Sequence, residues 1–96
     1  MPVQLKEVKD FIGQNVKIEG KVYGTKDLGS RVLVNVGGAY PNQLLTVVLK
    51  GDAKTPASRI DGKTIIVTGT LVDYKGKPEI IVTEATQIQI VSPRQP

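Results

Sequence analysis

Cationic side chains and tyrosine rings occur together at a few places in this sequence, near the ends of the expected strands. Cations can neutralise phosphates and flat rings can stack on bases, so the combination is typical of surfaces that bind a polyanion. Arg31 is the strongest candidate, because a guanidinium can stack on a base and can also pair with a phosphate. The full candidate set is Tyr23, Lys26, Arg31, Lys50, Tyr74, Lys75 and Lys77.

Several of these candidates also have a plain structural interpretation. Tyr23 and Tyr74 could cover the apolar ends of a barrel, which is an ordinary use of an amphipathic ring. Lys75 and Lys77 flank a glycine in an expected turn, where solvated lysines are common and hinder pairing between sheet edges. Tyr40, in a long loop, fits either loop packing or ligand contact. Both interpretations stay open at this point.

The residues that most enzymes use for catalysis are absent or isolated. The 96 residues include no Cys and no His, which excludes thiolate catalysis, Ser–His nucleophiles and His-based metal sites. Asp52 is explained as a helix cap and Asp61 as a turn residue, while Asp27 is expected to fix its loop through a local hydrogen bond or a salt bridge. No cluster of oxygen ligands is evident. We therefore expect a protein that is not an enzyme, with no catalytic residue, no metal site and no cofactor.

Length and composition indicate one small globular domain. The formal charge is +4, with 40% apolar and 23% charged residues. No apolar run approaches the roughly 20 residues needed to span a bilayer, and the first ten residues lack the apolar segment of a secretory signal. A cytoplasmic location is the default expectation. Export of a longer precursor stays open, because a chain without Cys is stable in either redox environment.

The first residues have the spacing of a helix. Leu5, Val8, Phe11 and Ile12 recur at offsets of three and four, with charged residues between them. This pattern predicts a short amphipathic helix that ends at Gly13. We expect residues 1–13 to form an N-terminal helix packed on the rest of the domain.

From residue 15 the apolar period becomes two, which is the period of half-buried strands. The chain between residues 24 and 30 breaks the alternation and predicts a loop. Gly20 and Gly69 lie in the middle of long strands, where a barrel needs a strand to curl. The expected strands are 15–23, 31–36, 44–50, 63–74 and 79–83, the last continued by 87–91. A helix over 53–60, capped by Asp52, and a turn over 75–78 complete the expected elements.

This order of elements favours a small barrel. About five strands are too few for a seven-stranded sandwich, whereas closure into a barrel removes the free edges. We expect an all-β protein, a five-stranded OB-fold Greek-key barrel with an N-terminal helix and a short helix between strands three and four. The barrel is expected over 14–91 and a disordered tail over 92–96.

Two stretches resemble known OB domains. Residues 20–29, GKVYGTKDLG, are similar to the G-x-V-x-x-x-(K/R)-D-x-G opening of the anticodon-binding OB domains of class II aminoacyl-tRNA synthetases. Residues 62–82, GKTIIVTGTLVDYKGKPEIIV, resemble the strand-hairpin-strand ending of many small bacterial nucleic-acid-binding OB domains. The resemblance covers about 15–91 and implies nucleic-acid binding. The outward residues of the second and third strands are expected to be Arg31, Leu33, Asn35, Thr46, Val48 and Lys50.

An OB barrel binds its ligand across strands two and three, between the first and last hairpin loops. We therefore expect a non-catalytic module that binds single-stranded DNA or RNA, or another polyanion, weakly and with little sequence specificity. The alternative is a protein-interaction or oligosaccharide-binding OB module, possibly from an exported protein. A monomer is the default, and a weak homodimer could form through outward Leu33, Val48 and Ile66.

Overall fold

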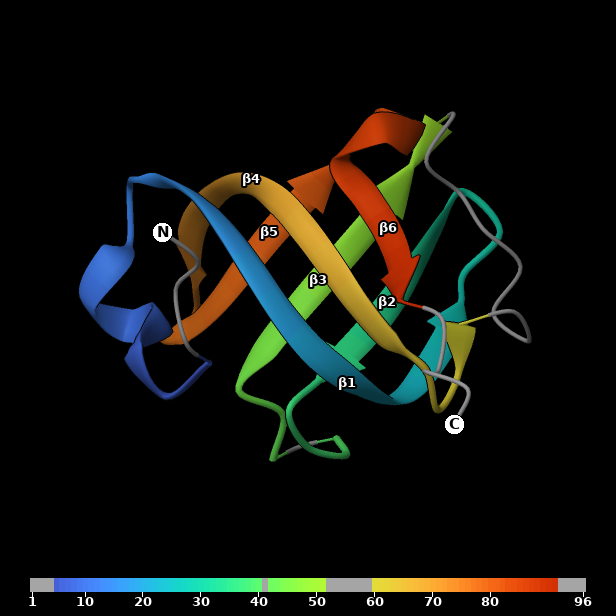
Figure 1. Ribbon diagram of the computed structural model, residues 1–96, viewed down its shortest axis with the longest axis horizontal. Helices are drawn as coiled ribbons and strands as arrows, with labels where there is room; N and C mark the ends of the chain where they lie inside the picture. The colour runs from blue at the N-terminus through green and yellow to red at the C-terminus, as the bar shows by residue number, and fades with distance from the viewer. Residues whose placement is uncertain (1–4, 41, 52–59, 92–96) are drawn as a thin grey trace.

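The computed structural model describes residues 5–40, 42–51 and 60–91, which form six strands and two short 3-10 helices (Figure 1). The helix η1 comprises Leu5–Phe11, and η3 comprises Ala85–Gln87. The strands are β1 (Asn15–Asp27), β2 (Arg31–Val36), β3 (Leu45–Lys50), β4 (Thr64–Tyr74), β5 (Lys77–Val82) and β6 (Ile88–Val91). The helix expected over 53–60 and the tail over 92–96 lie outside the described residues, apart from Ile60.

Five of the strands close into a barrel. Antiparallel pairs join β1 to β2, β2 to β3, and β5 to β4, while β3 and β5 run parallel. The pairing of β1 with β4 closes the ring, and β6 adds to the free side of β4. Figure 1 shows β1 and β4 crossing the barrel as long, strongly curved ribbons. The predicted all-β OB-fold barrel is confirmed.

The strand β1 serves two partners and changes partner at a bulge. Its first half pairs with β4, and its second half pairs with β2 after a register shift between Val22 and Gly24. The sequence placed a loop at 24–30, but the strand continues to Asp27. The prediction was wrong because the inserted residue, Tyr23, shifts the alternation by one, which looks in the sequence like the end of a strand.

The two mid-strand glycines lie where other side chains cross the strand closely. A Cβ atom on Gly20 would lie 2.6 Å from Val36 Cγ1, and one on Gly69 would lie 2.7 Å from Ile80 Cγ2. Neither glycine is needed for a left-handed backbone, because neither has a positive φ. Their role is therefore to leave space at the points where the curled strands pack tightly.

The barrel interior contains the residues that the period of two assigns to it. Burial of each aliphatic side chain contributes about 1.5–3 kcal/mol, so this core is the main source of stability. Val8 of η1 and Ile60 also belong to it. The buried strand residues are Val16, Ile18, Val22, Val32, Val34, Val36, Leu45, Val47, Leu49, Ile65, Val67, Leu71, Ile80 and Val82.

The N-terminal helix differs from the expected amphipathic helix in its winding. Leu5, Val8 and Phe11 are spaced by three, and a 3-10 helix with three residues per turn aligns them on one side. Val8 is buried and the other two pack against the core, whereas Ile12, which the sequence placed on the same apolar face, remains 39% exposed. The chain leaves the helix through Gly13, at φ +91°.

The last part of the chain also differs from expectation. The turn between β4 and β5 is only Lys75 and Gly76, with φ values of 52° and 85°, so β5 begins at Lys77 and includes the buried Pro78. Positive φ at both central residues identifies a tight type I′ hairpin turn, which needs no further residues. The 3-10 helix η3 then separates β5 from β6, which pairs with β4 instead of continuing β5.

Candidate ligand-binding groove

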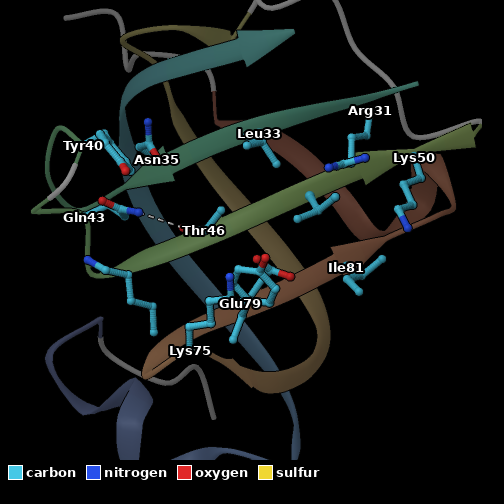
Figure 2. Close-up of a pocket in the computed structure, with 13 residues that line it drawn as sticks. Arg31, Leu33, Asn35, Tyr40, Gln43, Thr46, Lys50, Lys75, Glu79 and Ile81 are labelled. Carbon is cyan, nitrogen blue, oxygen red and sulfur yellow. Dashed lines mark hydrogen bonds between the residues drawn. The ribbon is translucent and has the colours of Figure 1, made fainter. Parts of the chain in front are cut away.

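A hollow of about 410 Å³ lies over the outer face of β2, β3 and β5 (Figure 2). All six residues expected to point outward from the second and third strands line it. They are joined by residues from the loop before β3, from the β4–β5 turn and from β5. The lining comprises Arg31, Leu33, Asn35, Tyr40, Gln43, Thr46, Val48, Lys50, Tyr74, Lys75, Lys77, Glu79 and Ile81.

Strand register divides the floor of the groove into rows, because directly paired residues point to the same face. Arg31 pairs with Lys50 and forms a cationic row at one end. The next row is aliphatic: Leu33 pairs with Val48, and Val48 pairs with Ile81. Figure 2 shows Arg31 and Lys50 at the end of the groove opposite to the long loop. The floor therefore offers apolar contact beside two positive charges.

A third row is polar and contains a carboxylate. Asn35 pairs with Thr46, and Thr46 pairs with Glu79. Partial burial raises the pKa of the Glu79 carboxyl above its ordinary value, and the positive charges of Arg31 and Lys50 offset part of this rise. In the sequence, Glu79 is only the first residue of the strand expected over 79–83. Its central place in the groove depends on the parallel pairing of β3 with β5, which no local pattern reveals.

The β4–β5 turn forms the other cationic edge. Tyr74 is 55% exposed and pairs with Lys77, and the Lys75 ammonium lies 5.4 Å from the centroid of the Tyr74 ring. The backbone N–H of Gly76 donates a 2.9 Å hydrogen bond to Asp73 Oδ1, which holds the turn. Three predicted candidates, from one tight turn, thus line the groove together.

Two predicted candidates do not line this groove. Tyr23 lies at the bulge of β1, and its ring centroid is 5.5 Å from the Lys21 ammonium. Lys26 pairs with Leu33 and therefore points to the same outer face, one strand beyond the groove. The bulge is the physical reason for both positions, because it extends β1 and turns Lys26 onto this face.

The loop between β1 and β2 is ordered by its own backbone and by one carboxylate. The N–H of Gly29 donates to Asp27 Oδ1 at 2.8 Å, and the N–H of Leu28 donates to the Arg31 carbonyl at 2.8 Å. The local hydrogen bond expected of Asp27 is confirmed. These bonds hold the loop next to the cationic row.

The long loop before β3 contributes two residues to the groove. For Tyr40 the sequence is compatible with either loop packing or ligand contact, and for Gln43 it indicates no role. Tyr40 is 74% exposed and lies in Figure 2 at the same end of the groove as Asn35 and Gln43. The Gln43 amide donates a 3.1 Å hydrogen bond to Thr46 Oγ1, while its Oε1 is buried without a hydrogen-bond partner among the described residues. A loop that joins two groove strands is the signal that could have identified both residues.

The expected apolar patch for pairing two copies is divided by the fold. Leu33 and Val48 are direct partners in the groove, but Ile66 pairs with Glu19 and Gln89 on another side of the barrel.

Among the described residues, no helix is long and apolar enough to cross a membrane.

Comparisons with known proteins bear on the fold. No protein-family model and no curated protein matches the sequence. Among solved structures, the chain is similar to a protein from Leishmania major Friedlin assigned as an aspartyl-tRNA synthetase, with 12% identity, a TM-score of 0.68, and coverage of 99% of this chain and 21% of that chain. It is also similar to asparaginyl-tRNA synthetase from Pyrococcus horikoshii, with 17% identity, a TM-score of 0.66, and coverage of 94% and 23%. The chain thus spans about a fifth of the length of each, and at these identities the likeness establishes the fold: a five-stranded OB barrel.

Proposed function

We propose that this protein is a non-catalytic module that binds single-stranded nucleic acid in the groove over β2, β3 and β5. One observation carries the proposal: cations lie at both ends of an open groove, Arg31 and Lys50 at one and Lys75 and Lys77 at the other. This arrangement matches a strand whose phosphates are neutralised at both ends of the floor. The OB face is also where such barrels commonly bind oligonucleotides.

The bases would lie between the two cationic ends. Tyr40 and Tyr74 are exposed rings at the edge of the groove and supply stacking, worth roughly 1–3 kcal/mol per base. The aliphatic row beneath offers apolar contact without a preferred base. This combination predicts weak binding with little sequence specificity, whether the strand is DNA or RNA.

An NMR titration of the labelled protein with a short mixed-sequence single-stranded oligonucleotide tests the proposal. We expect salt-sensitive shifts of the amides of Arg31, Lys50 and Tyr74–Lys77, because phosphate neutralisation releases counterions. Repeating the titration at higher salt should weaken the shifts together. An unperturbed spectrum at millimolar oligonucleotide, or shifts confined to the opposite side of the barrel, would refute the proposal.

The second candidate is a protein-interaction module, and the aliphatic row favours it. Leu33 and Val48 line the groove, and Ile81 beside them is 42% exposed, so an extended apolar peptide could dock there. Such binding would change little between low and physiological salt. A partner that binds the groove without salt dependence would therefore select this candidate over nucleic acid.

A further inference from the structure

A second hollow, of about 360 Å³, adjoins the groove on the far side of the β4–β5 turn. Gln43, Lys75 and Lys77 line both hollows, so the two surfaces are contiguous. On its other side the second hollow is lined by Lys6 and Lys9 of η1. Four lysines from two elements that are far apart in sequence thus surround one depression.

The winding of η1 separates its charges. With three residues per turn, residues three apart lie directly above one another. This places Lys6 and Lys9 in a basic stripe and Glu7 and Asp10 in an acidic stripe. In an α-helix, Lys6 would instead lie next to Asp10, four residues later, and part of its charge would be neutralised.

The acidic groups around the basic stripe are few. Neither Glu7 nor Asp10 lines the second hollow, and none of the described residues that line it is acidic. Asp73 lies nearby with Lys9 in a smaller hollow, where its Oδ1 accepts the hydrogen bond from Gly76. The hollow therefore presents a positive surface that continues the cationic end of the groove.

We propose that Lys6 and Lys9 extend the phosphate-binding track of the groove across η1. A single strand that leaves the groove at the β4–β5 turn passes over the second hollow, where its phosphates contact both lysines. This inference rests on the proposed function and adds a length requirement to it. A strand that only fills the groove does not reach η1, whereas a longer one does.

The test compares two double variants that each lower the net charge by two, from +4 to +2. Lys6→Gln/Lys9→Gln removes the basic stripe, while Lys17→Gln/Lys63→Gln removes two exposed lysines that line none of the three hollows. Binding of single-stranded DNA of about four and about twelve nucleotides, within the range of OB site sizes, is measured by fluorescence anisotropy over a salt series.

For the long strand, loss of the basic stripe should lower affinity roughly tenfold near physiological salt and reduce the salt slope by about 1.4, the values for two phosphate contacts. The Lys17/Lys63 variant should show neither change. The two charge-lowering variants should bind the short strand with equal affinity. Lys6→Arg/Lys9→Arg should retain long-strand affinity, and thermal melting should verify that η1 and the barrel remain folded.

If both charge-lowering variants lost the same amount of affinity for the long strand, the inference would be overturned, because net charge alone would then explain the losses. The same holds for an equal loss of short-strand and long-strand binding in the Lys6/Lys9 variant, or for binding that this variant leaves unchanged. If the unmodified protein binds neither strand, the proposed function fails as well. The two failures are therefore distinguishable.

Discussion

At the residue scale, the groove contains one group that opposes its proposed ligand. Glu79 lies in the polar row, where its carboxylate would repel the phosphates of a bound strand and keep them toward the two cationic ends. Because burial raises the pKa of Glu79, less acid is needed to neutralise it than for an exposed carboxyl. Its charge can therefore be tested separately from the cations.

Glu79→Gln should strengthen oligonucleotide binding at neutral pH. In the unmodified protein, affinity should rise as the pH falls through the raised pKa of Glu79, because protonation removes the repulsion. The variant should lack this rise. Oligothymidylate is the suitable probe, since its bases do not take up a proton in this range. A variant that binds more weakly, or that keeps the full pH dependence, would contradict this role.

The same ionisation affects stability with a definite sign. A carboxyl whose folded-state pKa is raised destabilises the folded protein when ionised, so its contribution is favourable below the ordinary carboxyl pKa and is lost as the pH rises through the raised value. Glu79→Gln should therefore melt at a slightly higher temperature at neutral pH. The difference between the two proteins should diminish in acid.

At the element scale, the β4–β5 turn combines a strained backbone with a proposed binding role. Lys75 is the one described non-glycine residue with a positive φ, at 52°. A lysine in this conformation costs free energy that Asn, the preferred residue at the first position of a type I′ turn, would largely avoid. The lysine is thus a poor choice for the turn alone, which is consistent with a contact made by its ammonium.

Lys75→Asn should raise the free energy of unfolding by up to about 1 kcal/mol and lower oligonucleotide affinity. Lys77→Asn is the matched control, because it removes the same charge where φ is not positive. The control should lower affinity without the gain in stability. Urea denaturation and anisotropy measure the two effects. A loss of stability in Lys75→Asn would show that the turn geometry is not the source of strain.

The curled strand β1 offers a second test at this scale. Gly20→Ala should lower the free energy of unfolding by about 1–3 kcal/mol, because its Cβ would lie 2.6 Å from Val36 Cγ1 and 2.7 Å from Leu5 Cδ1. Gly24→Ala, in the same strand, should cost much less, since its Cβ would meet only Asn35 Nδ2, at 3.8 Å. Urea denaturation compares them, and similar losses would contradict the close approach at Gly20.

At the scale of the whole molecule, the distribution of charge matters more than its total. A net charge of +4 is modest, but cations lie at both ends of the groove and continue onto η1. Counterion release depends on the number of phosphates contacted. The salt dependence of binding therefore reports how many of these cations a strand reaches.

For a short single strand that carries at least four phosphates, four contacts from Arg31, Lys50, Lys75 and Lys77 should give a slope of log affinity against log salt of about −2.8. Anisotropy over a salt series measures this slope. Arg31→Ala should reduce its magnitude by about 0.7, the value for one contact. A slope near zero would exclude phosphate neutralisation as the main source of affinity and would favour the protein-interaction candidate.

Much of the fold could be predicted because each strand carries its own in-and-out pattern. Ile65, Val67, Gly69 and Leu71 occupy every second position of β4, and a period of two assigns them to the interior whatever their partners are. The outward positions on β2 and β3 follow from the same rule. The sequence by itself therefore determined the barrel, its core and the β2 and β3 residues of all three rows of the groove.

Tertiary structure decided the features that depend on a partner. The bulge at Tyr23 is visible only in the register of β1 against β2, and it moved Lys26 onto the outer face. The parallel pairing of β3 with β5 brought Glu79 into the groove, and the packing of η1 against the barrel placed its lysines beside the β4–β5 turn. Local periodicity reports which face of an element a residue occupies, whereas long-range pairing determines which faces meet.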